Sequence, residues 1–250
     1  MLHHGCLSIF SDSMAHLHPY QRCVEDPHYS YPPSLSTYAF LLKKSQNNVL
    51  INSETEKHKN QWKTLFAFPY EKIHLEIGCN TGLVLLAKAL QYPKHFFIGL
   101  DWKYRAIFRA QEKAAKLLLK NTFFLRAHAL RLPYIFGPKE IDEISVFFPD
   151  PWPKQKHTKN RWITQKSLQN LANLITYGGI LTIKTDDFNY FQWILDATQK
   201  QSRWKITECI HHLYHHHSNP HQLDIPEVTP FEKIFIQKQI PIQKLTLQRI

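Results

Sequence analysis

A short acidic turn stands out among the residues that could do chemistry. The apolar run 146–148 ends in Pro-Asp-Pro-Trp-Pro, which begins at Pro149, and a row of cations follows. Proline fixes the backbone angle φ and restricts the residue before it, so we expect Asp150 in a preformed turn after a strand. Ligands of open α/β sheets bind at that edge. A fixed acid beside an indole and basic residues suits a flat, electron-rich base attached to a polyanion.

A glycine-containing loop joins a predicted strand to a predicted helix. Its sequence, Leu75-Glu-Ile-Gly-Cys-Asn-Thr-Gly82, includes Gly78 and Gly82, which permit a tight turn and close backbone approach to a ligand. Asp101 ends the next predicted strand, where an acid can accept both ribose hydroxyls of an adenosine. The early Glu76 and the lack of a phosphate-binding lysine are unlike a nicotinamide site. We therefore expect S-adenosylmethionine (SAM) as the cofactor, with Glu76 facing its amino acid portion.

Positive charge is both high and clustered. The formal net charge is +11, and residues 102–139 contain nine Lys or Arg against a single acid. Residues 151–185 contain no acid at all. A solvated face usually mixes both signs, so this clustering favours a surface that follows phosphates over one that is merely basic. The expected phosphate ligands are Lys154, Lys156, Lys159 and Arg161.

Strand-like and helix-like segments alternate from residue 71 onward. Alternation of this length predicts a mostly parallel, doubly wound α/β sheet. The predicted strands are Lys72–Ile77, His95–Asp101, 122–127, 143–148, 180–184, 205–210 and 233–238. The predicted helices are 83–92, 103–121, 161–177, which should stop at Gly178-Gly179, and 189–201. Residues 1–70 are expected to form a partly ordered extension with a short helix at 35–44, and 71–250 the main domain.

Several features bear on compartment and metal content. The four cysteines lack paired spacing, which favours a reducing cytoplasm. No apolar run approaches the roughly 20 residues that a membrane span needs, and the N-terminus does not resemble a signal peptide. Five histidines gather between His211 and His217, but no cysteine or carboxylate adjoins them. We expect no metal site and no membrane contact.

Six motifs occur in an order that resembles one known family. They are Leu75–Gly82, Phe97–Asp101, Phe147–Lys154 with the basic tail to Arg161, Gly178-Gly179, Lys184-Thr-Asp186 and Thr229-Pro-Phe-Glu232. Together they look like the bacterial tRNA (guanine-N7)-methyltransferases of the TrmB type. The resemblance covers residues 71 to 238, and the Pro-Asp-Pro-Trp-Pro-Lys segment is its most specific part.

The resemblance implies a fold, a reaction and a set of roles. The fold would be a Rossmann-like, class I SAM-dependent methyltransferase fold with a C-terminal antiparallel strand. The reaction would be methyl transfer from SAM to N7 of a guanine in tRNA, in the variable loop (the position-46 class). Asp150 would be catalytic. The cofactor residues would be Glu76, Gly78, Gly82, Asp101, His128 and Asp150, and the substrate residues Lys154, Asp186, Thr229 and Glu232.

Three positions depart from the family pattern. Asn80 stands where a second glycine is usual, and His128 stands where an acid or amide usually contacts the adenine amine. Pro230 replaces a lysine of the usual T-K-F-E segment, which removes a cation and a backbone donor. The acids Glu76, Asp101, Asp150 and Asp186 are retained, which favours an active enzyme over an inactive RNA-binding relative.

Guanine N7 chemistry requires little acid–base catalysis. The N7 lone pair is exposed and needs no deprotonation, so in-line positioning is the main task. The purine gains positive charge, which Asp150 or Asp186 would stabilise. Enzymes that methylate a base amine favour an acid or amide followed by Pro-Pro-aromatic, whereas here Trp152 and Pro153 exchange that order. The choice of tRNA, and whether the protein is a monomer or homodimer, stay open.

Overall fold

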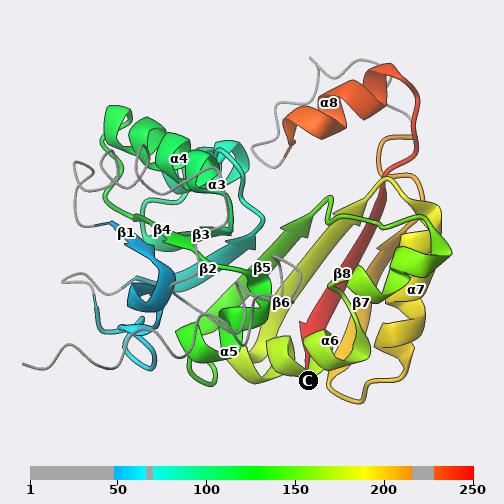
Figure 1. Cartoon of the computed structure of the whole chain (residues 1–250), viewed down its shortest axis with the longest axis horizontal. Coiled ribbons are helices and arrows are strands. Elements are labelled where there is room, and N and C mark those ends of the chain that lie inside the picture. The colour runs from blue at the N-terminus through cyan, green and yellow to red at the C-terminus, as the bar shows by residue number, and fades with distance from the viewer. Residues whose placement is uncertain (1–47, 66–69, 216–227) are drawn as a thin grey trace, which may run out of the picture.

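A computed structural model describes residues 48–65, 70–215 and 228–250 of the chain (Figure 1). Its strands are β1 Val49–Ile51, β2 Lys72–Ile77, β3 His95–Asp101, β4 Thr122–Arg126, β5 Ile141–Phe147, β6 Ile175–Thr185, β7 Trp204–Ile210 and β8 Gln243–Arg249. Its α-helices are α3 Leu83–Gln91, α4 Tyr104–Lys116, α5 Leu132–Ile135, α6 Gln165–Leu174, α7 Phe188–Gln199 and α8 Pro230–Gln237. Short 3-10 helices are η1 Asn52–Glu56, η2 Ala129–Arg131 and η3 Gln155–Asn160.

The described strands form one sheet with the order β1-β4-β3-β2-β5-β6-β8-β7. Strand β2 pairs in parallel with both β3 and β5, so the winding direction reverses at β2 and β5. Strand β8 lies antiparallel between β6 and β7. The predicted doubly wound, mostly parallel sheet with an antiparallel C-terminal strand is therefore confirmed. The reversal creates a switch point, where ligands of such sheets bind at the carboxyl ends of the strands.

Alternate side chains of the central strands fill two layers of core. In β3, Phe97 packs with α3 and α4 on one face, and its neighbour Phe96 joins the larger cluster on the other face. Both rings are almost fully buried. Burial of each such side chain contributes about 1.5–3 kcal/mol, so the central strands are rigid supports for the residues at their ends.

The C-terminal region differs from the sequence prediction. Residues predicted as a strand at 233–238 form helix α8, because Thr229 and Glu232 make a reciprocal capping box and Pro230 occupies the first turn. The closing strand is β8 instead, where alternate residues are buried and Leu245 and Leu247 are fully enclosed. The Thr-x-x-Glu pattern was thus also a signal for the start of a helix.

Two predicted helices are longer than the helices that form. Helix α6 starts at Gln165 because Thr164 and Ser167 form a capping box, in which each side chain accepts a hydrogen bond from the backbone N–H of the other residue. The helix ends at Leu174. The glycine pair does not stop this helix but lies within β6, at a register irregularity against β5. A side chain at Gly179 would come within 2.7 Å of the Asp142 carbonyl oxygen, so the irregularity requires glycine. Helix α4 ends early, before Leu118, whose φ is +55°.

The described residues before position 70 contribute to the sheet and its core. Strand β1 pairs in parallel with β4. Trp62 is fully buried, and its indole Nε1–H donates to the Ile135 carbonyl oxygen at 3.0 Å. Its backbone N–H donates to a Glu140 carboxylate oxygen, also at 3.0 Å. The boundary near residue 70 stays a prediction, and the short helix predicted at 35–44 lies outside the described residues.

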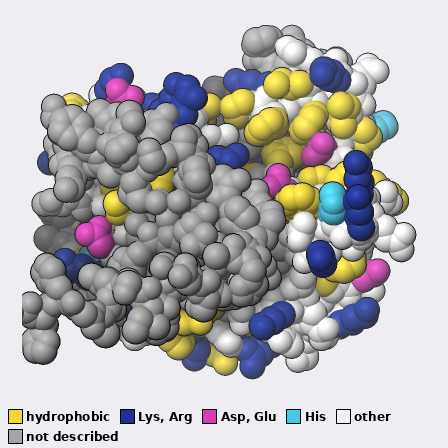
Figure 2. All heavy atoms as spheres, in the orientation of Figure 1, with side chains coloured by type: hydrophobic (Ala, Val, Ile, Leu, Met, Phe, Trp, Pro, Cys, Tyr) yellow, Lys and Arg dark blue, Asp and Glu magenta, His cyan; other side chains and the backbone are white. Residues whose placement is uncertain are grey.

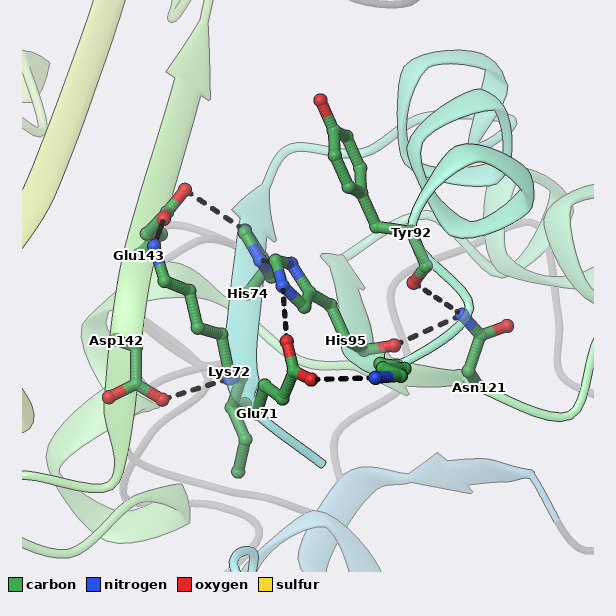
Figure 3. A network of polar contacts seen from close by, with 10 residues as sticks. Glu71, Lys72, His74, Tyr92, His95, Asn121, Asp142 and Glu143 are labelled. Atoms are coloured by element: carbon green, nitrogen blue, oxygen red, sulfur yellow. Dashed lines mark hydrogen bonds and ion pairs between the residues drawn. The ribbon is translucent and has the colours of Figure 1, made fainter. Parts of the chain in front are cut away.

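A polar network crosses the amino ends of the central strands, opposite the ligand edge (Figure 3). His74 contacts a Glu143 oxygen at 3.2 Å and the His95 ring nitrogen at 2.9 Å. Lys72 donates to Glu143 at 2.7 Å. The hydrogen bond from His74, and then that from Lys72, lower the pKa of Glu143 to about 2 against the opposing effect of burial. The network joins β2, β3 and β5 below the site.

Candidate active site at the carboxyl edge of the sheet

Four acids lie along the carboxyl edge of four neighbouring strands. Glu76 is the penultimate residue of β2, and Asp101 is the last residue of β3. Asp150 follows β5 by three residues, and Asp186 follows β6 directly. Since β3, β2, β5 and β6 are consecutive in the sheet, these four predicted site residues share one edge at the switch point (Figure 1).

The glycine loop has the backbone that its sequence predicts. Gly78 has a φ of +77°, and no atom of the described residues lies within 4 Å of where its Cβ would be, so these residues leave the backbone there open to a ligand. Gly82 has a φ of +71° and caps α3, and a side chain there would come within 3.0 Å of Ala110 Cβ. Asn80 also has a positive φ, +48°. Asparagine tolerates this conformation better than other non-glycine residues, which explains how it replaces the usual glycine.

Asp101 is held by the loop that it supports. Its oxygens accept from the Asn80 N–H at 3.0 Å and from the Lys103 N–H at 2.9 Å. Burial raises the pKa of Asp101, and these two N–H groups oppose the rise. The carboxylate is therefore fixed in orientation at the end of β3, as recognition of a ribose requires.

Glu76 lies half-buried between β2 and α3. It shares a hollow there with His74, Lys88 and Ser145. Burial raises its pKa to about 7, although the Lys88 charge and the Leu85 backbone N–H both lower it. An acid in this state ionises readily once a cationic group arrives, because the cation favours the charged form.

His128 differs in chemistry from the acid or amide usual at its position. It caps η2, and its Nδ1 accepts from the Leu130 N–H at 3.2 Å. Burial, followed by the Arg126 charge, lowers its pKa to about 4. The ring is therefore neutral at pH 7 with its proton on Nε2, which makes Nε2 a donor.

The turn that carries Asp150 is strained and held at both ends. Phe148 and Trp152 have φ values of +52° and +45°, an unfavourable region for bulky residues. The Phe148 N–H donates to the Lys184 carbonyl oxygen at 2.8 Å, and Arg161 Nε donates to the Pro151 carbonyl oxygen at 2.8 Å. Asp150 is exposed, and no hydrogen bond or ion pair holds it within the described part of the chain.

Arg161 is not placed to hold phosphate, contrary to the prediction. It is 7% exposed, and its guanidinium lies over the rings of Tyr190 and Trp193 at 5.1 and 5.2 Å. It supports the turn instead. The predicted lysines are exposed and form a basic strip, defined here as Lys154, Lys156 and Lys159.

The remaining predicted substrate residues divide into exposed and buried groups. Asp186 is exposed to solvent on one side, and partial desolvation of its carboxyl group raises its pKa. Thr229 and Glu232 are buried as the cap of α8, and Glu232 also contacts Lys184 and Tyr214. Sequence reasoning missed these two partners. The Lys-Thr-Asp motif included Lys184, whereas nothing local in the sequence indicated Tyr214.

Helix α8 presents apolar side chains to solvent beside the site. Phe231 is 51% exposed and Ile234 44% exposed. Figure 2 shows hydrophobic side chains gathered over α8, with acidic side chains next to them. The Phe231 ring lies 6.1 Å from that of Phe148, two residues before Asp150.

The described residues contain no group of three His, Cys, Asp or Glu side chains that could hold a metal ion. His216 and His217 of the histidine cluster lie outside them. None of the described helices has the length and apolar character of a membrane span.

Comparison with known proteins identifies the family. A family model described as "Putative methyltransferase" matches residues 70–245. A tRNA (guanine-N(7)-)-methyltransferase of Bdellovibrio bacteriovorus is 32% identical over 181 residues, which cover 71% of this chain and 83% of that protein. The chain belongs to the TrmB-type tRNA (guanine-N7)-methyltransferase family. A TrmB-type relative from Lachnoclostridium phytofermentans is 30% identical over 205 residues, covering 82% of this chain and 92% of its own.

Solved structures of other methyltransferases share the fold of this TrmB-type chain. The 16S rRNA methyltransferase KamB matches with a TM-score of 0.55 at 18% identity, covering 76% of this chain and 91% of KamB. TrmN from Thermus thermophilus matches with a TM-score of 0.52 at 17% identity, covering 72% of this chain and 45% of TrmN. The Rossmann-like methyltransferase fold and the family membership, both expected from the sequence, are confirmed.

Proposed function

We propose that this protein transfers a methyl group from SAM to N7 of a guanine in tRNA. The observation that carries the proposal is the Asp150 turn. It presents an exposed acid on a constrained backbone, between a glycine loop suited to a nucleoside and a basic strip suited to phosphates. The relatives named as tRNA (guanine-N(7)-)-methyltransferases support the choice of substrate and atom.

The residues beside the glycine loop fit SAM. Asp101 offers a fixed carboxylate to ribose hydroxyls, and the described residues leave space above Gly78 for a ligand to reach the backbone. Glu76, with a pKa of about 7, suits the cationic amino acid portion. When bound, SAM would supply a methyl group on a positively charged sulfur.

Asp150 would act through its charge and position. Guanine N7 has a lone pair available for attack, so no residue needs to remove a proton first. The base becomes positively charged as the bond forms, and a carboxylate already in place stabilises that charge without reorganising. The strained turn supplies the fixed geometry on which in-line attack depends. Asp186, at the end of the neighbouring strand, offers a second carboxylate for the base edge.

The basic strip would hold the RNA backbone near the site. Its three lysines follow the Asp150 turn directly and are exposed on η3. Contacts to phosphate fix register and orientation but not base identity. RNA bases are read where they are unstacked, as in a loop, because the A-form major groove is too narrow for side chains. A guanine in the variable loop is accessible in this sense.

A methyl-transfer assay with a matched variant tests the proposal. Purified protein is incubated with methyl-labelled SAM and unmodified tRNA, beside an Asp150→Asn variant that has the same shape without the charge. We expect label in the tRNA with the native protein and a large loss with the variant. A native protein that labels no tRNA, or a variant as active as the native protein, would refute the proposal.

A further inference from the structure

A buried ion pair joins α8 to the sheet directly beneath the site. Lys184, near the end of β6, is 2% exposed, and Glu232 in the first turn of α8 is fully buried. Their Nζ and Oε1 atoms are 2.8 Å apart. The Tyr214 hydroxyl donates to the same Oε1 at 2.7 Å, and the Thr229 N–H donates to Oε2 at 2.6 Å. Both carboxylate oxygens are thereby engaged within the protein.

Lys184 also touches the turn that carries Asp150. Its carbonyl oxygen accepts from the Phe148 N–H at 2.8 Å, and its ammonium lies 4.8 Å from the centre of the Phe147 ring. The Phe148 ring in turn lies 5.5 Å from the ring of Phe235 on α8. One residue thus contacts the acidic turn through its backbone and α8 through its side chain.

Such a pair is better suited to fixing position than to adding stability. Desolvation of two charges costs about as much as their attraction returns, and apolar replacements are often at least as stable. Removal of one partner is costly, because it leaves a buried charge unpaired. The position that this pair fixes is that of α8, whose exposed Phe231 lies beside the Asp150 turn.

We propose that Lys184 is a positioning residue that docks α8 against the Asp150 turn through Glu232, and so forms one wall of the tRNA site. On this assignment, Glu232 holds the helix and does not contact the substrate itself. The proposal rests on the proposed function only for the identity of the RNA; the docking of α8 stands apart from it.

Three variants separate positioning from stability. Lys184→Met and Glu232→Gln each remove one charge of the pair and leave the other buried. The double variant removes both charges, and a glutamine still completes a capping box. Lys244→Met is the control. Lys244 lies opposite Lys184 in the β6–β8 register, and it makes an ion pair of similar length, 2.7 Å, with Glu208 nearer the surface.

Two measurements, both independent of turnover, decide the proposal at a temperature where thermal melts show every variant folded. Hydrogen exchange reports whether residues 230–237 stay protected, and titrations give the Kd for tRNA and for SAM. We expect each single variant to lose protection in α8 and to bind tRNA roughly tenfold or more weakly, with SAM affinity within about twofold. The double variant should recover most of both losses, and Lys244→Met should match the native protein.

Other outcomes overturn the proposal in recognisable ways. Single variants that melt earlier but keep α8 protection and tRNA affinity would show a purely structural pair. A double variant as impaired as the singles would show that the two residues do not act through their mutual pairing, which contradicts the proposal. A native protein that binds tRNA but does not methylate it would refute the proposed function, and these measurements would still decide how α8 is docked.

Discussion

Replacement of Glu76 by glutamine should change how stability depends on pH. Burial raises the pKa of this carboxyl from 4.5 to about 7 in the folded protein. As pH rises from about 4.5 to about 7, the unfolded chain releases this proton while the folded chain keeps it. The folded state then binds more protons, so the native protein loses stability with rising pH. Glutamine does not titrate, so Glu76→Gln should not show this loss.

The size of the effect follows from the shift. The difference between 7 and 4.5 is about 2.5 pKa units. At about 1.4 kcal/mol for each unit, the native protein should lose up to about 3 kcal/mol relative to Glu76→Gln across the window. The variant should therefore be relatively more stable at neutral pH, although it lacks the acid proposed to face the cofactor.

Urea unfolding of both proteins without cofactor measures this difference. The free energy of unfolding is determined at several values between about pH 5 and pH 8, and only the difference between the two proteins is compared. Titrating groups that do not interact with Glu76 are common to both proteins and cancel. A difference that does not change with pH, or one that favours the native protein more as pH rises, would refute the reasoning. Titrations with SAM near neutral pH should also show proton release by the native protein but not by the variant.

Four further variants have definite expected outcomes. Asp150→Asn should lower kcat by roughly a hundredfold or more with an unchanged melting temperature, since the residue is exposed and its charge is used only in the reaction; a lower melting temperature would indicate a structural role. Alanine at the three lysines of the basic strip should flatten the dependence of log K for tRNA binding on the logarithm of the salt concentration. Arg161→Ala should mainly lower the melting temperature, because that side chain is buried. A flatter salt dependence for Arg161→Ala, or a lower melting temperature for the lysine variant, would contradict these assignments. Gly82→Ala should reduce the free energy of unfolding by about 1–3 kcal/mol, because φ is positive and the added Cβ would lie 3.0 Å from Ala110 Cβ. Chemical denaturation would measure this loss of stability.

The sequence predicted the centre of the fold well. Strands β2 and β3 form at the predicted residues, because their apolar patterns are bounded by a glycine loop and an acidic end. The acids at the carboxyl edge could be placed together for the same reason, since the order of a doubly wound sheet brings those strand ends to one side.

The periphery depended on contacts that no local pattern reveals. Residues 233–238 were predicted as a strand, although they contain the apolar run Ile234-Phe-Ile236 of helix α8, and the Thr229 segment was interpreted only as a substrate motif. Arg161 lies within a basic run but is buried by rings from α7. The link between Tyr214 and Glu232 spans a region of the chain that local spacing does not connect.

Chemical mapping of the methylated base tests the central claim most directly. Unmodified tRNA is treated with the native protein and SAM, then with borohydride and aniline, which cleave the chain at N7-methylguanine. We predict methyl incorporation together with a single cleavage in the variable loop, and neither when Asp150→Asn replaces the native protein. Incorporation of the methyl group without cleavage would contradict N7 as the target, and a cut elsewhere in the tRNA would contradict the variable loop as its location.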